Sequence, residues 1–277
     1  MSFGMAKKLP STTRIAWLGN SYIFYNMLPV LVASLIEAPP TAGTAGRIVS
    51  HSEITQGGAQ LADHASNHRV SVMLQESWDV VVLQDNSQVP GGAIPEALEY
   101  SRTALDWFAP FLQGRTRCML FSTWGHREGS SNFPDAYPDF RTMQEKTSDG
   151  YERYARRLRA LAVDVTVVPV GDAFRRVHRA EPKPLQADSL FSRLYVSDGS
   201  HPSALGSYLA ALVFALVLLP EEVALSSSVP PSIAAEVSIE DARRLRQIAD
   251  LTIAEAREVG ALPPRQSKPP PDAKSEL

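Results

Sequence analysis

The sequence predicts an α/β protein, a three-layer α/β/α sandwich around a five-stranded, mostly parallel sheet. Two observations lead to this prediction. Short apolar runs alternate with longer segments of helical pattern, which is typical of strand–helix–strand units. Three of the runs, at residues 15–18, 80–83 and 165–168, are almost continuously apolar, as expected of strands that helices cover on both faces.

Composition and charge narrow the class of protein. The chain has 277 residues, of which 44% are hydrophobic, so one α/β domain with a sizeable core is expected. The 27 Lys and Arg residues against 30 Asp and Glu residues give a net charge of −3, which argues against nucleic acid and anionic membranes as partners. A single cysteine, Cys118, excludes an internal disulfide and a thiolate metal cage.

The strands and helices follow one another in regular order. Five strands are expected at residues 13–18, 47–52, 79–84, 117–122 and 163–168. Six helices are expected at residues 28–37, 60–76, 95–112, 140–161, 173–178 and 203–219. Residues 205–219 are strongly apolar, but 15 residues are too few to cross a bilayer, which takes about 20. We therefore expect a buried helix there and, with no signal peptide visible, a cytoplasmic protein.

The C-terminal region differs from the rest of the chain. A capping box at Ser238–Asp241 predicts a last helix, and an apolar stripe from Ile239 through Leu245 to Val259 predicts that it packs on the domain. Residues 261–277 contain five prolines among scattered charges and are expected to be a disordered tail that buries nothing. The expected division is thus a domain at 13–260 and a tail at 261–277.

A candidate nucleophile follows the first strand, in the segment Gly19-Asn20-Ser21-Tyr22. A serine at the end of a strand and the start of a helix lies where open α/β sheets bind their ligands. Its own N–H then points into the site and can stabilise an anion. Taken alone, the segment is more typical of an ordinary turn with a helix N-cap, because Ser and Asn are common in turns.

A candidate base lies just before the apolar helix expected at 203–219, in the segment Asp198-Gly199-Ser200-His201-Pro202. A carboxylate three residues before a histidine can reach the histidine's Nδ1–H, which leaves Nε2 free to accept a serine proton. An Asx turn with a solvated histidine is the plain alternative. In a doubly wound sheet both segments meet at the carboxyl edge, and a serine beside an acid-held base is the arrangement of acyl transfer.

Acyl transfer also needs donors for an oxyanion, and two further loops offer them. Gly57-Gly58-Ala59 follows the second strand, where glycine lets a backbone N–H approach a ligand closely. The segment 84–88, Gln-Asp-Asn-Ser-Gln, follows the third strand and offers side-chain amides. After the fourth strand, Trp124-Gly125-His126 either lines the pocket or packs in the core.

With these blocks the chain resembles the SGNH/GDSL hydrolases, a family of serine esterases. Gly19-Asn20-Ser21 is similar to the first block, with Asn for the usual Asp, and Gly58 matches the glycine of the second. Asp198-x-x-His201-Pro is similar to the last block and is the most specific match. The resemblance covers residues 15–219. It implies a flavodoxin-like sheet, a catalytic triad of Ser21, Asp198 and His201, and an oxyanion hole that includes the N–H groups of Ser21 and Gly58.

The third block departs from the family pattern. The family shows Gly-x-Asn-Asp after its strand, and this chain has Gln84-Asp85-Asn86-Ser87-Gln88. Asn86 matches in residue type and is preferred as the third oxyanion donor. Counting without a gap places Gln88 there instead, and the amide of Gln84 is a further alternative.

The resulting expectation is a serine esterase that hydrolyses or transfers small acyl groups through an acyl-enzyme, without metal or organic cofactor. Its substrate would be a small-molecule or carbohydrate ester, as in the carbohydrate O-deacetylases of the family. A non-catalytic binding module on the same fold is the alternative, motivated by the altered third block. A flavodoxin-like mononucleotide binder is a third possibility, but no phosphate loop follows the first strand. The sequence indicates neither the natural substrate nor the oligomeric state.

Overall fold

A computed structural model of the chain describes residues 10, 12–37, 48–219, 225–226 and 228–263. Its five strands form one sheet, with β1 at Thr12–Gly19, β2 at Ile48–Thr55, β3 at Val80–Leu83, β4 at Arg117–Phe121 and β5 at Val165–Val168. The strand order is β2-β1-β3-β4-β5, and all four neighbouring pairs are parallel. The predicted fold class and the flavodoxin-like order are therefore confirmed.

The second strand differs in its bounds from the prediction. Arg47, its expected first residue, lies outside the described residues, and β2 continues three residues beyond Ser52, to Thr55. The reason is its pairing with β1, which matches every residue from Thr12 opposite Ile48 to Gly19 opposite Thr55. A strand that is paired along its whole length keeps its extended form as far as its partner does.

Ten α-helices lie among the described residues. They are α1 at Ser21–Phe24, α2 at Leu28–Glu37, α3 at Leu61–Ala65, α4 at His68–Leu74, α5 at Pro95–Leu112, α6 at Phe140–Ala160, α7 at Val170–Ala180, α8 at Leu190–Arg193, α9 at Ala204–Leu218 and α10 at Ile239–Glu258. Two short 3₁₀ helices lie at Tyr25–Met27 (η1) and Pro231–Ile233 (η2). The four-residue helices α1 and α8 were not predicted.

The single helix predicted at 60–76 is two helices, α3 and α4. The break falls at Ser66-Asn67, where the Asn67 side chain accepts a hydrogen bond from the Arg69 N–H and caps α4. Asparagine competes with the helix for backbone groups, so it is favoured at such a new start.

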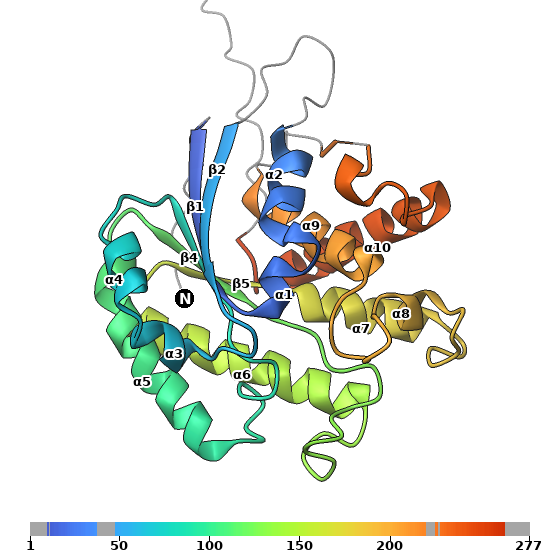
Figure 1. Cartoon of the computed structure of the whole chain (residues 1–277), viewed down its shortest axis with the longest axis horizontal. Coiled ribbons are helices and arrows are strands. Elements are labelled where there is room, and N and C mark those ends of the chain that lie inside the picture. The colour runs from blue at the N-terminus through green and yellow to red at the C-terminus, as the bar shows by residue number, and fades with distance from the viewer. Residues whose placement is uncertain (1–9, 11, 38–47, 220–224, 227, 264–277) are drawn as a thin grey trace, which may run out of the picture.

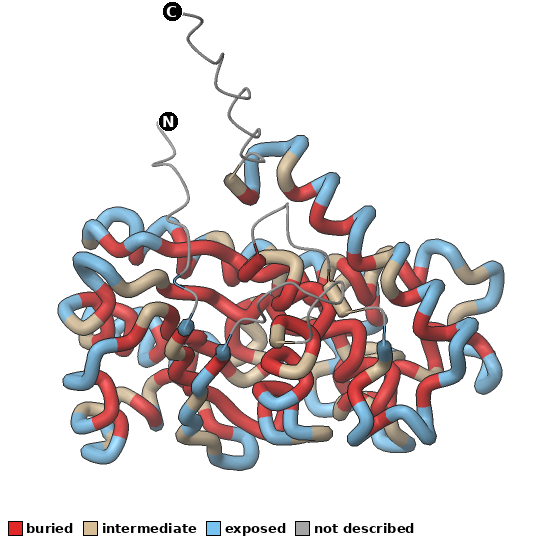
Figure 2. Tube along the Cα trace, turned by 90° about the horizontal axis from the view of Figure 1, so that it is seen from above, coloured by how far each residue is buried: buried red, intermediate tan, exposed pale blue. Residues whose placement is uncertain are grey.

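The helices cover both faces of the sheet, because successive strand residues point to opposite sides. In β1, Ile15 and Trp17 join a core with residues of α2, α7, α9 and α10, whereas Ala16 and Leu18 join a second core with residues of α3, α4, α5 and α6. Figure 1 shows these two groups of helices on either side of the strands. Buried segments run through the middle of the molecule and exposed ones lie around its rim (Figure 2).

The apolar helix predicted at 203–219 is α9, and it is a core helix. It contacts α2, α7 and α10, and all but two of its 15 residues are buried. Within the described part of the chain, we find no helix whose length and apolar character would suffice for a membrane span.

The last helix, α10, begins at its predicted cap, since Ser238 accepts a hydrogen bond from the Asp241 N–H. The middle of its predicted apolar stripe is buried, including Leu245. The prediction is wrong at the two ends of the stripe, where Ile239 is 81% exposed and Val259 is 71% exposed. These terminal turns extend beyond the surface on which the helix packs.

One residue of the predicted tail is part of the core. Gly260, at φ 73°, ends α10, and the N–H groups of Ala261 and Leu262 both donate to the Ala256 carbonyl. This turn is the Schellman type of helix end, which directs a following apolar side chain back onto the helix. The side chain of Leu262 is buried, so the expectation that residues from 261 onward bury nothing is wrong at this position. Residues 264–277 lie outside the described residues.

Candidate active site

The first predicted segment forms a tight turn directly after β1. Gly19 is required there, because a Cβ at this position would overlap the side chains of Gln84 and Ile23. Asn20 caps α1: its Oδ1 accepts the Tyr22 N–H at 3.2 Å, and its Nδ2 donates to the Ala59 carbonyl at 3.0 Å. The first N–H groups of a helix have no partner within the helix. That of Ser21 has no acceptor among the described residues, so it is free for a ligand.

The second predicted segment also folds into a turn held by its own acid. Asp198 Oδ1 accepts the N–H groups of Ser200 and His201 at 2.8 and 2.9 Å, while Oδ2 accepts His201 Nδ1–H at 2.7 Å. Gly199 adopts φ 69°, a value that favours glycine. One carboxylate therefore fixes both the backbone of the turn and the orientation of the imidazole.

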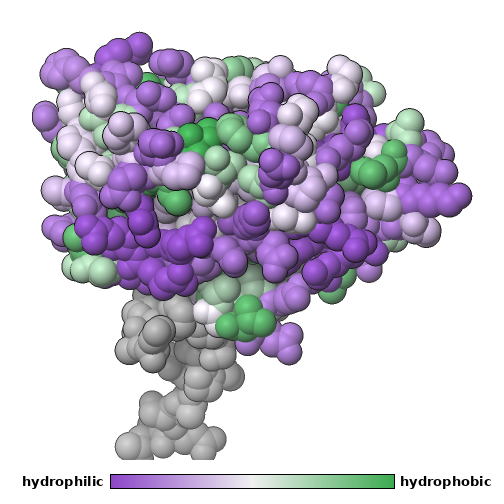
Figure 3. Space-filling view, turned by 90° about the horizontal axis from the view of Figure 1, so that it is seen from below, coloured by the Kyte–Doolittle hydropathy of each residue, from purple (hydrophilic) through white to green (hydrophobic). Residues whose placement is uncertain are grey.

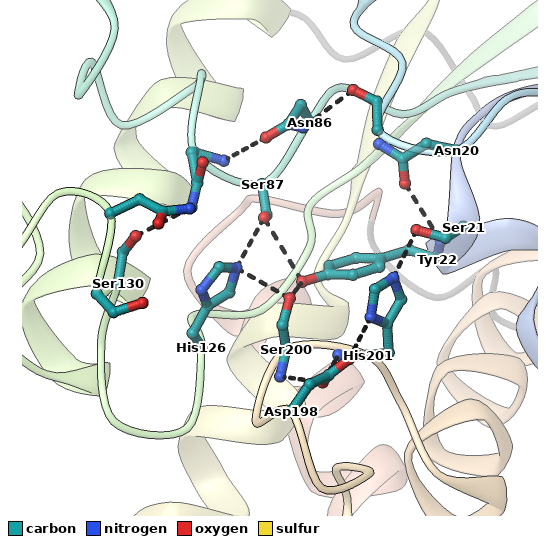
Figure 4. Close-up of a pocket in the computed structure, with 14 residues that line it drawn as sticks. Asn20, Ser21, Tyr22, Asn86, Ser87, His126, Ser130, Asp198, Ser200 and His201 are labelled. Atoms are coloured by element: carbon teal, nitrogen blue, oxygen red, sulfur yellow. Dashed lines mark hydrogen bonds and ion pairs between the residues drawn. The ribbon is translucent and has the colours of Figure 1, made fainter.

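The two segments meet across the sheet edge. His201 Nε2 lies 2.8 Å from Ser21 Oγ, although 180 residues separate the two in the chain. Since Nδ1–H faces the Asp198 carboxylate, Nε2 is the nitrogen that can accept the serine proton. The structure thus brings Ser21, His201 and Asp198 into one hydrogen-bonded chain, visible in Figure 4.

The electrostatics of the turn favour an ionised carboxylate. Partial burial acts to raise the pKa of Asp198, but the hydrogen bonds from the Ser200 N–H and from the ring and N–H of His201 outweigh it and hold the pKa below its ordinary value. Tyr25 stacks on the His201 ring, with centroids 4.5 Å apart and an interplanar angle of 19°. The imidazole is therefore fixed by a carboxylate at one edge and an aromatic face on one side.

The donors expected for an oxyanion lie beside Ser21. Gly58, at φ 71°, and Asn86 both line the same pocket as Ser21. The N–H of Gly58 has no acceptor among the described residues. Asn86 donates one amide N–H to the Gly58 carbonyl at 3.0 Å and accepts the Gln88 N–H at its Oδ1, which leaves its second amide N–H for a ligand.

The two alternatives for the third donor differ from Asn86. Gln84 is fully buried outside the pocket lining; its Oε1 accepts the Asn20 N–H at 2.8 Å and its amide donates to the Asp85 carbonyl. Its role is to hold the turn that presents Ser21. Gln88 lines the pocket, but its amide donates to Ser130 Oγ at 2.9 Å.

A buried acid supports this loop from behind. Asp85 accepts hydrogen bonds from the Tyr154 hydroxyl at 2.8 Å and from the N–H groups of Asn86 and Leu61. Its complete burial raises the pKa of the carboxyl, although these hydrogen bonds act in the opposite direction. The loop that carries Asn86 is therefore tied to both α3 and α6.

Sequence reasoning expected the loop after β4 either at the pocket or in the core, but it gave Ser87 and Ser200 no role. Trp124 is fully buried and stacks on Tyr22, and His126, two residues further on, lines the pocket, so the loop after β4 both packs and lines. His126 Nε2 lies 3.1 Å from the hydroxyls of Ser87 and Ser200. The one available signal was position: Ser87 follows Asn86, and Ser200 precedes His201.

The pocket has a volume of about 340 Å³ and a polar lining. Its lining residues are Asn20, Ser21, Tyr22, Gly58, Asn86, Ser87, Gln88, His126, Ser130, Ser131, Asn132, Asp198, Ser200 and His201. None of them is aliphatic. The surrounding surface, seen from the side on which β1 and β2 end, is also mostly hydrophilic (Figure 3).

Comparisons with known proteins gave matches among solved structures, whereas neither protein-family models nor curated proteins gave a match. A proposed SGNH hydrolase from Slackia heliotrinireducens is 25% identical, with a TM-score of 0.55 over 74% of this chain and 98% of that one. A DUF4886 family protein from Bacteroides uniformis has a TM-score of 0.66 at 17% identity, over 88% and 95%. A lipase/acylhydrolase from Enterococcus faecalis has a TM-score of 0.51 at 14% identity, over 74% and 94%. The comparisons confirm that this chain has the fold of the SGNH/GDSL hydrolases and resembles that family.

Proposed function

We propose that this protein is a serine esterase that cleaves small acyl groups from alcohols through an acyl-enzyme at Ser21. The observation that carries the proposal is the hydrogen-bonded chain from Ser21 Oγ to His201 Nε2 and from His201 Nδ1 to Asp198. A serine next to a base that is oriented by an acid is the general arrangement of nucleophilic acyl transfer. The fold shared with SGNH hydrolases supports it.

In the first half of the reaction, Ser21 Oγ attacks the ester carbonyl carbon and passes its proton to His201 Nε2. The carbonyl electron pair becomes an oxyanion, which the free N–H groups of Ser21 and Gly58 and the second amide N–H of Asn86 would stabilise. As the carbonyl reforms, the bond to the alcohol oxygen breaks, and His201 returns the proton to that oxygen. The alcohol leaves and the acyl group stays on Ser21.

In the second half, water takes the place of the alcohol. His201 Nε2 accepts a proton from the water as it attacks the acyl carbon, and gives that proton to Ser21 Oγ as the acid leaves. The ionised Asp198, whose pKa is held low, stabilises the imidazolium that forms in both halves. An alcohol in place of water would make the reaction an acyl transfer, which the same residues support.

The pocket supports a small substrate. About 340 Å³ without an aliphatic wall suits a short acyl group on a polar alcohol better than a fatty acyl chain. We therefore favour acetylated carbohydrates as substrates, which would make the protein a carbohydrate O-deacetylase. The proposed chemistry uses only side chains and water.

Labelling with a fluorophosphonate probe tests the proposal directly. The probe should modify the wild-type protein at Ser21, as mapped by mass spectrometry, and should not modify Ser21→Ala. Ser71→Ala, which removes a half-buried serine hydroxyl of helix α4 outside the pocket lining, is the matched control and should label like the wild type. Absence of labelling and of any ester hydrolysis in the wild type would favour a non-catalytic binding module.

A further inference from the structure

A second polar cluster lies beside Ser21, and the mechanism above does not use it. It consists of Tyr22, Ser87, His126 and Ser200, which we call the hydroxyl cluster. The Tyr22 hydroxyl is 2.8 Å from Ser200 Oγ and 3.5 Å from Ser87 Oγ, and both serines are 3.1 Å from His126 Nε2. Figure 4 shows both serine hydroxyls directed at this nitrogen and the Tyr22 hydroxyl beside the two serines.

The cluster keeps hydrogen-bonding capacity that its own groups do not use. An imidazole nitrogen carries either one hydrogen or one lone pair, so His126 Nε2 forms one full hydrogen bond in either tautomer. Two serine hydroxyls lie at the same distance from it. The Tyr22 hydroxyl is the other partner of the two serines among the described residues. A hydroxyl offers one hydrogen and two lone pairs, so each serine, with at most two bonds within the cluster, keeps a donor or acceptor position for a ligand. Both serines line the pocket, so a ligand can supply the missing partner.

The cluster is electrically neutral, which limits the ligand that it fits. Burial lowers the pKa of His126 to about 4, the nearby Asp198 charge raises it, and His201 lowers it. Among the described residues, no carboxylate forms a hydrogen bond with the His126 ring. A neutral imidazole with neutral hydroxyls offers no charge to an anion or a cation, but it offers both donors and acceptors to an alcohol.

The place of the cluster indicates which part of a substrate it would contact. Ser200 directly precedes His201, the residue that returns the proton to the leaving alcohol in the proposed mechanism. Ser87 directly follows Asn86, on the side of the oxyanion donors. A hydroxyl neighbouring the ester oxygen, on the alcohol part of the substrate, would thus be within the same pocket as the scissile bond.

We propose that Ser87, Ser200 and His126 form a hydroxyl-binding subsite, and that the substrate is an ester of a polyhydroxylated alcohol, such as a sugar, with a free hydroxyl next to the esterified one. This inference rests on the proposed esterase function. A hydroxyl group is donor and acceptor at once, so it completes the cluster in either tautomer of His126. The subsite makes partially acylated sugars better substrates than simple esters.

The test compares two esters across matched variants. One is a mono-O-acetylated methyl pyranoside with a free neighbouring hydroxyl, and the other is 4-nitrophenyl acetate, which has none. For Ser87→Ala and His126→Gln, kcat/KM on the sugar acetate should fall about tenfold, the value of roughly one lost neutral hydrogen bond. On 4-nitrophenyl acetate it should stay within about twofold. His68→Gln, an exposed histidine of α4, is the control and should match the wild type on both.

A third ester makes the test reciprocal. The deoxy analogue of the sugar acetate, without the neighbouring hydroxyl, should be about tenfold poorer than the parent for the wild type. This penalty should be clearly smaller for Ser87→Ala, because the contact with Ser87 is then already lost. A glycolyl ester of nitrophenol, which carries its hydroxyl on the acyl side, should show no dependence on Ser87. A dependence there would overturn the assignment to the alcohol side.

Two failures can be told apart. If Ser21 is labelled by the fluorophosphonate probe but the variants lose activity equally on all esters, the cluster only positions the site and the subsite proposal is wrong. If Ser21 is not labelled and no ester is hydrolysed, the proposed function itself is wrong, and the subsite falls with it. We expect that the probe labels Ser21, that the wild type hydrolyses the esters, and that the variants lose activity only on the sugar acetate.

Discussion

Two histidines share one pocket and have opposite surroundings. His201 has one partner at each ring nitrogen, the Asp198 carboxylate at Nδ1 and the Ser21 hydroxyl at Nε2. His126 has two serine hydroxyls at a single nitrogen and, among the described residues, no carboxylate partner. Burial lowers the pKa of His126 to about 4, so this ring is neutral at neutral pH.

The difference shows that partners, and not residue type, decide what a histidine can do. A carboxylate at Nδ1 fixes the tautomer and stabilises the imidazolium, which is what a proton-transferring base needs. A buried imidazole without an acid resists protonation and is suited to neutral hydrogen bonding. We therefore assign proton transfer to His201 and substrate binding to His126.

The largest expected effect comes from breaking the His201 side. Ser21→Ala and His201→Ala should each lower kcat on a short-chain aryl ester by about 10⁴ to 10⁶, because triad members act as one unit. Both variants should stay folded, as circular dichroism and melting can show, since neither side chain belongs to the two apolar cores. Wild-type turnover in His201→Ala would reverse our assignment of the two histidines.

The next effect concerns the acid. Asp198→Asn should lower kcat by about 10² to 10⁴, because the amide can offer a hydrogen to Nδ1 and favour the wrong tautomer. Its loss should be smaller than that of His201→Ala, since the ring and its stacking partner Tyr25 remain. The Asn side chain can still accept the N–H groups of Ser200 and His201, so the turn should persist. An unchanged kcat would show that the carboxylate does not orient His201.

The catalytic residues around His201 and the hydroxyl cluster around His126 also differ in how far the sequence predicted them. Asp198 and His201 are three residues apart, and a single turn brings them together, so local spacing is enough to propose the pair. Ser21 could be added because strand ends of a parallel sheet meet at one edge. The positions of the strands could also be predicted from local sequence, because each strand is a short apolar run.

The hydroxyl cluster has no such local signature. Its contacts join His126 to residues 39 and 74 positions away, and serines are common in every loop. The choice among Gln84, Asn86 and Gln88 depended on side-chain directions in a buried loop, which no pattern encodes. Leu262 was missed for a related reason, because the composition of the following residues hid one apolar anchor placed by the turn at Gly260.

A difference in acid stability should separate the two histidines without any substrate. The folded pKa of His126 is about 4 against an ordinary value of 6.5, so between these pH values the unfolded chain binds a proton that the folded protein does not. Stability is therefore complete above about pH 6.5 and falls as the pH is lowered, by about 2 kcal/mol at pH 5 for this group.

Melting temperatures of the wild type and His126→Gln at pH 7.5 and pH 5 measure the loss of stability that His126 causes at acid pH. The wild type should lose about 4–8 °C more than the variant over this range. The pKa values of His64 and His178 are also lowered by burial, but these residues are present in both proteins and cancel in the comparison. Equal losses in the two proteins would mean that His126 takes up its proton freely in the folded state.

The smallest expected effect concerns Tyr25, the aromatic ring that stacks on His201. Tyr25 stacks on His201 at 4.5 Å, and no aromatic ring contact of this kind involves His126 among the described residues. An aromatic contact of this type is worth about 0.5–1.5 kcal/mol, so Tyr25→Leu should lower kcat/KM by about 2- to 12-fold. Tyr100→Leu, at an exposed position of α5, is the control and should leave kcat/KM unchanged. The loss should be the same for the sugar acetate and for 4-nitrophenyl acetate, because Tyr25 acts on the base that both esters share. A loss confined to the sugar acetate would place Tyr25 with the hydroxyl cluster and would weaken the division of work between the two histidines.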